Sequence, residues 1–243
     1  MRNAVYWYQR LLTLGRRVQM SGYGQFCPVA KAMELLDERW TVLVVRELLA
    51  GSTHFNDLRR GVPKMSPSLL SKRLQTLTRA GVVDRSEVEG RTIYTLTDCG
   101  RELVGVVEAL GAWSVRWMSD LVEKDLDPSV LMWDIRRTIP LDQWPRGRTV
   151  VAFRLSGAPP KASSWWLMVA DGEAQVCDFD PGYEVAATVS TSLRTLSQIW
   201  RGDQSWQRAT LDGSVSIAGP REARRSVPTW IGQSGLAAVP RPA

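Results

Sequence analysis

The chain has 243 residues, of which 44% are hydrophobic and 23% are charged, and its formal net charge is +6. This length exceeds that of a typical single domain, so the sequence predicts two domains. The basic excess lies in the first half, because residues 1–120 carry 17 Lys and Arg against 12 Asp and Glu. Three cysteines at irregular spacing exclude a disulfide framework and a zinc site, and they indicate a reducing compartment.

No apolar run approaches the roughly 20 residues that a membrane-spanning helix needs, and the N-terminus lacks the apolar core of a signal peptide. We therefore expect a cytoplasmic protein that does not bind membranes. Residues 1–22 are expected to form an N-terminal extension. This extension is either an amphipathic arm or, if translation starts at Met20 instead of Met1, an upstream segment, and the sequence leaves both alternatives open.

Three short helices are predicted first. One begins at Pro28, because proline is tolerated in a first turn, and apolar residues follow it at helical spacing. The second runs from Trp40 and ends before Gly51. Ser52 or Thr53 is expected to cap the third.

A fourth helix begins at Ser66, where a serine cap precedes a proline, and Leu70, Leu74 and Leu77 form its apolar stripe. Hydroxyls and longer donors on the other side are the groups that contact phosphates and base edges in a DNA groove. Residues 59–79 hold six Lys and Arg and no acid, which favours a polyanionic partner. The alternative is an ordinary solvated helix face. The predicted DNA contacts on this helix are Ser66, Ser68, Ser71, Lys72, Arg73, Gln75 and Arg79.

Residues 82–88 and 91–97 are β-branched runs joined by a turn at Glu89-Gly90, which predicts a hairpin with Arg91 as a further DNA contact. A long helix capped by Thr97 or Asp98 then carries an apolar stripe as far as Leu121. Such a stripe suits a helix from a second copy, and a two-fold dimer would read two DNA half-sites. Packing against the C-terminal domain is the alternative. The predicted fold is a mainly α winged helix-turn-helix over residues 23–122.

Several motifs within residues 23–120 together resemble the HxlR-type, MarR-like winged-helix regulators. They are Cys27-Pro28, Arg39-Trp40, Arg46-Glu47-Leu48, Phe55 to Leu58, Ser66 to Leu74, Gly81-Val82-Val83, Tyr94 to Thr97 and Trp113. The resemblance implies a dimeric bacterial transcription regulator with the fourth helix in the major groove. The hairpin is shorter than in many relatives, so wing contacts are not carried over. Relatives also imply a redox-sensing role for Cys27, whose place beside a helix N-terminus favours the thiolate.

The second half is predicted to be an α+β domain, residues 128–237, in which helices cover an antiparallel sheet, followed by a tail at 238–243. The order of its elements is similar to sterol-carrier-protein-type domains, which implies an apolar ligand between sheet and helices. The alternative is that the same side chains are simply core. Candidate pocket residues are Trp165, Met168, Phe179, Trp200, Trp206 and Ile217.

No arrangement of residues supports catalysis. The one histidine, His54, lies far in sequence from Cys27 and Cys177, and no phosphate-binding loop occurs. We expect no enzyme activity, no cofactor and no metal. The expected function is sequence-specific regulation of transcription through double-stranded DNA, by a homodimer that an apolar ligand or cysteine oxidation modulates. The alternative is a lipid-carrier or scaffold protein that uses the winged domain only to dimerise.

Overall fold

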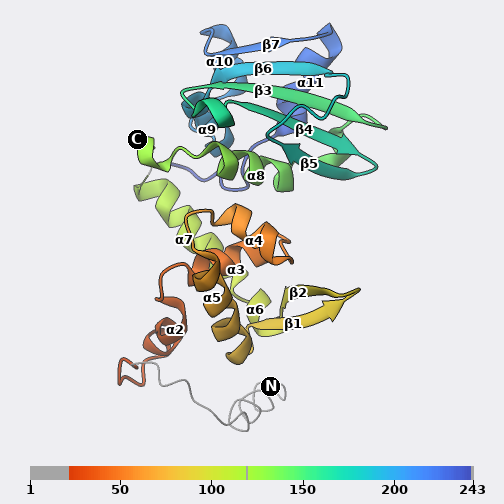
Figure 1. Cartoon of the computed structure of the whole chain (residues 1–243). Coiled ribbons are helices and arrows are strands. Elements are labelled where there is room, and N and C mark those ends of the chain that lie inside the picture. Colours follow the sequence, from red (N-terminus) through yellow and green to blue (C-terminus); the bar gives the residue numbers. More distant parts are fainter. Residues whose placement is uncertain (1–21, 119, 242–243) are drawn as a thin grey trace. The chain divides into compact units, whose positions relative to one another are not determined.

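A computed structural model describes residues 22–118 and 120–241 (Figure 1). The chain divides into two compact units, Met1–Ala109 and Leu110–Ala243. Nearly all of the predicted N-terminal extension lies outside the described residues, and the domain boundaries expected from the sequence stay predictions. None of the helices in the described part of the chain combines the length and the apolar character needed to cross a membrane.

The first unit begins with four helices that follow the predicted order. They are α2 (Pro28–Leu36), α3 (Thr41–Leu49), α4 (Phe55–Gly61) and α5 (Pro67–Arg79). The expected cap of α4 is wrong, because His54 and not Ser52 or Thr53 stands at the N-cap. At α5 the cap is the predicted one, since the hydroxyl of Ser66 accepts a hydrogen bond from the amide of Leu69 at 3.3 Å.

A hairpin and two helices follow: β1 (Val83–Val88), β2 (Arg91–Leu96), α6 (Asp98–Arg101) and α7 (Val104–Trp117). β1 and β2 are antiparallel, and both turn residues, Glu89 and Gly90, have positive φ, as a two-residue hairpin turn with right-handed twist requires. The single long helix predicted after Thr97 is instead divided into α6 and α7. Thr97 caps α6 by accepting from the amide of Gly100 at 3.1 Å.

One apolar cluster holds the first unit together, and α3, α4, α5 and the hairpin all contribute to it. Leu58, Leu70 and Leu77 are fully buried within it. The carboxylate of Glu47 is also fully buried, and it accepts from the guanidinium of Arg46 at 2.6 Å. That guanidinium also donates to the carbonyl of Gly61 at 3.1 Å, so this polar contact joins α3 to the end of α4.

α7 crosses the boundary between the two units. After α7, the described residues of the second unit form five strands and four α-helices. The strands are β3 (Thr149–Ser156), β4 (Ser164–Ala170), β5 (Glu173–Cys177), β6 (Ala187–Ser192) and β7 (Val215–Ala218). The helices are α8 (Pro128–Thr138), α9 (Leu193–Arg201), α10 (Trp206–Leu211) and α11 (Arg221–Ile231), with short 3-10 turns at Glu123–Asp125, Leu141–Gln143 and Pro160–Ala162. The order of strands in the sheet is β5-β4-β3-β6-β7.

The sheet is mixed, which corrects the expectation of an antiparallel one. β3, β4 and β5 form the predicted antiparallel meander, and β7 is antiparallel to β6. β6, however, pairs with β3 in parallel, with Val151 opposite Ala187 and Ser156 opposite Ser192. The chain therefore crosses from β5, at one edge, back over the meander to the far side of β3.

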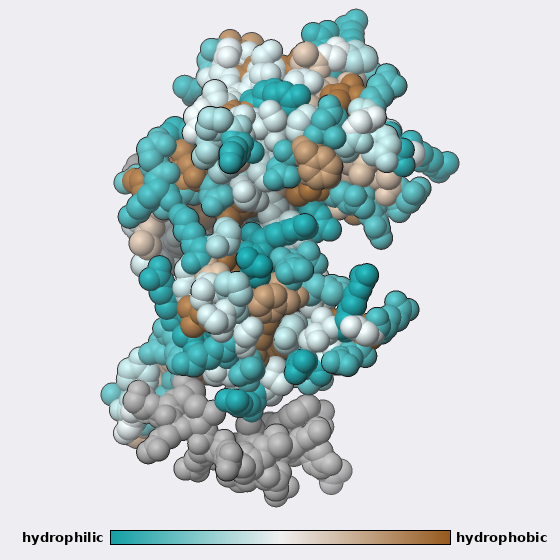
Figure 2. Space-filling view, viewed as in Figure 1, coloured by the Kyte–Doolittle hydropathy of each residue, from teal (hydrophilic) through white to brown (hydrophobic). Residues whose placement is uncertain are grey.

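Helices cover one face of this sheet. Residues of α8, α9, α10 and α11 share one buried cluster with Val151, Phe153 and Leu155, which alternate along β3. The intervening residues Val150 and Ala152 belong to a smaller cluster with Trp166. On the face seen in Figure 2, hydrophobic residues form small, separate patches in a mostly hydrophilic surface.

The close approach of α6 to Val82, just before the start of β1, leads to a stability prediction. A Cβ at Gly100 would lie 2.2 Å from the carbonyl oxygen of Val82, a backbone atom that cannot move aside freely. We expect Gly100→Ala to lower the free energy of unfolding by about 1–3 kcal/mol through overpacking, measured by urea denaturation. Gly105→Ala is the matched control, since no atom beyond its chain neighbours and the backbone of its own helix lies within 4 Å of the added Cβ. Equal stability of the two variants would contradict this packing.

Candidate nucleic-acid interface

α5 presents a polar face to solvent. Ser68, Lys72, Gln75 and Arg79 lie at i, i+4, i+7 and i+11, and all four are exposed, while Leu70, Leu74 and Leu77 are buried on the other side. Ser66 is also exposed at the start of the helix, and Ser71 is half-buried. The helix thus places short hydroxyls at its N-terminal end and longer donors along its length, which is the arrangement that major-groove contact requires.

Arg73 does not belong to this face, which corrects its place among the predicted DNA contacts. Its side chain is only 10% exposed and forms an ion pair with Glu38. Its Nε also donates to the carbonyl of Arg39 at 3.2 Å. Burial lowers the pKa of the Arg73 guanidinium. The side chain therefore anchors α5 to the turn before α3 and is not available to DNA.

Cations dominate the exposed surface around α5. Arg59, Lys64, Lys72 and Arg79 are exposed, and within the described part of the chain no carboxylate pairs with Lys72 or Arg79. Asp57 on α4 is half-exposed and lies 3.7 Å from Arg60 and 3.9 Å from His54. Two unpaired cations on the exposed face of one helix make that face favourable for phosphate contact.

The hairpin of β1 and β2 is attached beside α4. The amide of Tyr94 donates to the carbonyl of Thr53 at 2.8 Å, just before α4 begins. Arg91, a predicted DNA contact, is exposed next to the turn, but Glu87 and Glu89 are exposed on the same short hairpin. Contact between the hairpin and a phosphate backbone is therefore less favoured than contact through α5.

Cys27 occupies the N-cap position of α2. It is half-exposed, makes no side-chain cap hydrogen bond and forms no disulfide. Cys99 and Cys177 likewise form no disulfide. Cys27 is thus placed where a solute can reach its sulfur.

Sequence comparison agrees with this geometry. The sequence model of a family described as HxlR-like helix-turn-helix matches residues 35–121. The uncharacterized HTH-type transcriptional regulator YvaP of Bacillus subtilis is 35% identical over 111 residues, which are 44% of this chain and 95% of that relative. The chain belongs to the HxlR-like helix-turn-helix family.

Two further comparisons concern one relative of this HxlR-like chain. The HTH-type transcriptional regulator YodB of Bacillus subtilis is 33% identical over 92 residues, which are 36% of this chain and 82% of that relative. A solved structure of YodB in its reduced form shares 30% identity and covers 38% of this chain and 95% of that one, with a TM-score of 0.35. These relatives are named as transcriptional regulators and not as enzymes.

The six predicted pocket residues of the HxlR-like chain do not meet in one site. The core between the sheet and the helices buries Trp165, Trp200 and Trp206. Ile217 is partly buried and packs against that core. Met168 lies on the opposite face of the sheet, because residues at odd spacing along a strand point to opposite sides. Phe179, beyond the end of β5, is 64% exposed.

One of these residues does line a groove. Trp206 borders a hollow of about 580 Å³ between α10 and the end of α11. Leu211 and Pro228 supply apolar walls, and Gln233 supplies an amide. A second groove, of about 650 Å³, lies over strand ends elsewhere in this unit. No sequence pattern predicts the second groove, since its residues come from several strands. The one local signal is Arg154, the single charged residue of β3.

Removal of Arg73 and removal of its neighbour Lys72 are expected to change the free energy of unfolding by different amounts. Arg73→Ala breaks a mostly buried charged contact and should lower the free energy of unfolding by about 1.5–3 kcal/mol. Lys72→Ala removes an exposed side chain and should change it by less than about 0.5 kcal/mol. Urea denaturation followed by far-UV circular dichroism measures both. Similar losses from the two substitutions would show that Arg73 is not an anchor.

Proposed function

We propose that this protein is a sequence-specific DNA-binding transcription regulator that inserts α5 into the major groove. The observation that carries the proposal is the exposed face of Ser68, Lys72, Gln75 and Arg79, whose cations pair with no described carboxylate. The family and the names of its relatives support the same function.

We propose further that it acts as a homodimer. Val106, Leu110, Trp113 and Trp117 recur at i, i+4, i+7 and i+11 on α7, and each is at least 45% exposed. An unpaired apolar stripe of this length is favourable to bury against the same helix of a second copy. The N-terminal region adds exposed apolar side chains at Phe26 and Val29. A two-fold dimer would place two α5 helices on successive half-sites.

Two features support modulation of this regulator. The groove beside Trp206 has the apolar lining and the few polar groups that suit a small apolar ligand, in a unit we propose to be sterol-carrier-like. Cys27, half-exposed at the start of α2, is the proposed site of oxidation. Either event would act by favouring one arrangement of the dimer over another.

A mobility-shift titration on the DNA upstream of its own gene, against scrambled DNA, tests the regulator proposal. We expect preferential binding that weakens as salt rises. Lys72→Ala should weaken binding and lower the slope of log affinity against log salt by about one unit, because one phosphate contact is lost.

Lys161→Ala is the matched control, because Lys161 belongs to the 3-10 turn Pro160–Ala162 of the second unit and not to α5. It should bind DNA as the unsubstituted protein does. If Lys72→Ala and Arg79→Ala both bind with unchanged affinity and slope, α5 is not the DNA-reading helix, and the alternative of a carrier or scaffold protein gains weight.

The dimer proposal has its own test. Leu110→Asp places a charge in the centre of the α7 stripe and should convert the dimer to a monomer, measured as molar mass by light scattering during gel filtration. Leu211→Asp is the matched control, since Leu211 is 80% exposed on α10. Retention of the dimer by Leu110→Asp would reject α7 as the dimer helix.

A further inference from the structure

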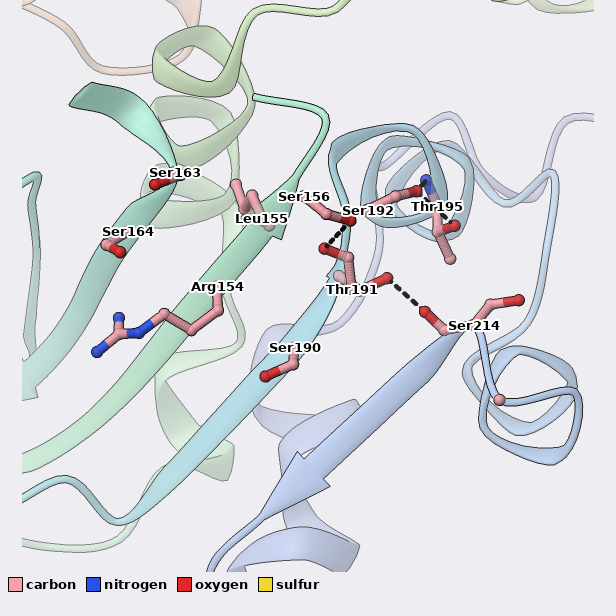
Figure 3. Close-up of a pocket in the computed structure, with 11 residues that line it drawn as sticks. Arg154, Leu155, Ser156, Ser163, Ser164, Ser190, Thr191, Ser192, Thr195 and Ser214 are labelled. Atoms are coloured by element: carbon pink, nitrogen blue, oxygen red, sulfur yellow. Dashed lines mark hydrogen bonds between the residues drawn. The ribbon is translucent and has the colours of Figure 1, made fainter. Parts of the chain in front are cut away.

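The second groove lies at the carboxyl ends of two parallel strands (Figure 3). β3 and β6 end side by side, with Ser156 opposite Ser192, and Ser164 at the start of β4 and Ser214 just before β7 complete the rim. In sheets with parallel strands, the carboxyl ends are the usual place for a ligand, because the strand connections diverge there and leave a hollow.

The lining of this groove is polar and contains one positive charge. It consists of Arg154, Leu155, Ser156, Ser163, Ser164, Ser190, Thr191, Ser192, Thr195, Gly213 and Ser214. Among the described residues that form it, none is acidic. Such a wall disfavours a lipid tail and favours a polar ligand with negative charge.

Arg154 is flanked on both sides by serine. It is opposite Ser164 on β4 and opposite Ser190 on β6, so the three side chains stand in one row on the face of the sheet that α8 to α11 do not cover. Directly opposed residues have Cβ atoms about 4.5–5.5 Å apart, close enough for their side chains to contact one small group together. Figure 3 shows the three residues on adjacent strands.

Each of these three side chains has hydrogen-bond donors that could bind a ligand. The guanidinium of Arg154 donates to the carbonyl of Phe153 at 3.2 Å and lies over the ring of Trp166 at 4.7 Å. It meets no carboxylate within the described part of the chain, and no described residue bonds the hydroxyls of Ser164 and Ser190. The stacking on Trp166 holds the planar guanidinium along the sheet with its remaining N–H groups open.

Other hydroxyls of the groove are used internally and fix its far wall. Thr191 donates to the carbonyl of Ser214 at 2.8 Å, and Ser192 and Thr195 share a hydrogen bond of 2.8 Å at the start of α9 (Figure 3). The groove is therefore formed before any ligand arrives, which reduces the entropy cost of binding.

We propose that this groove binds the phosphate group of a small polar phosphate ester. A phosphate offers several tetrahedrally arranged oxygens, which match one guanidinium and two flanking hydroxyls, whereas a carboxylate offers two oxygens in a plane. The remaining hydroxyl-lined space of the groove accommodates the polar part of the ester. This site lies in the second unit and does not depend on DNA binding, so either proposal can fail without the other.

Calorimetric titration of the full chain with glycerol 3-phosphate, in chloride buffer free of phosphate and sulfate, tests the proposal. We expect saturable binding that glycerol alone does not give. Arg154→Gln should weaken it by at least about tenfold, and Ser190→Ala by about threefold. Arg148→Gln is the matched control, since Arg148 likewise stacks on an aromatic ring, that of Tyr183 at 4.0 Å, but does not line the groove.

Two further binding measurements distinguish free phosphate from a lipid headgroup as the ligand of this groove. Inorganic phosphate measures the contribution of the anion alone, and cosedimentation with phosphatidic acid vesicles, against phosphatidylcholine vesicles, measures binding to a lipid headgroup. Binding in any arm that Arg154→Gln removes and Arg148→Gln retains supports the site. Absence of binding in all arms at millimolar ligand, or equal binding by Arg154→Gln and the unsubstituted protein, overturns it.

Discussion

The buried guanidinium of Arg73 determines how the first unit presents α5. Because it pairs with Glu38 and donates to the carbonyl of Arg39, it fixes the rotation of α5 against the turn before α3. That rotation places Lys72, the adjacent residue, in solvent. Burial lowers the pKa of Arg73, but arginine stays charged because its ordinary pKa is so high. The exposed face is thus set by a buried cation that is not part of that face.

Local patterns predicted the first unit well. The helices, the hairpin and the serine cap of α5 follow from spacing and turn chemistry, both of which act between residues a few positions apart. The burial of Arg73 also follows from local spacing, since Leu70, Arg73, Leu74 and Leu77 stand at i, i+3, i+4 and i+7, the spacing of a buried face. At α4, Ser52 and Thr53 have the chemistry of a helix cap, but the N-cap falls one residue after Thr53, at His54.

The second unit was less predictable because its arrangement depends on pairing between distant strands. Local sequence identifies β6 as a strand, yet nothing within it specifies that its neighbour is β3 or that the pair is parallel. The groove with Arg154 depends on that pairing, because the parallel pairing of β3 and β6 is what places Ser190 opposite Arg154. The faces of the strands were predictable, however: the odd spacing of Trp165 and Met168 already places them on opposite sides of the sheet.

The parallel pair also has a consequence for how the chain folds. β1 and β2 are joined by a two-residue turn, so the sheet of the first unit forms from neighbouring residues. β3 and β6 can pair only after the chain has closed the long connection that contains β4 and β5. Closing such a connection costs entropy before its contacts are made, and folding rates fall as contacts become less local. During synthesis the first unit also leaves the ribosome first. It is therefore expected to fold before the strands of the second unit have paired.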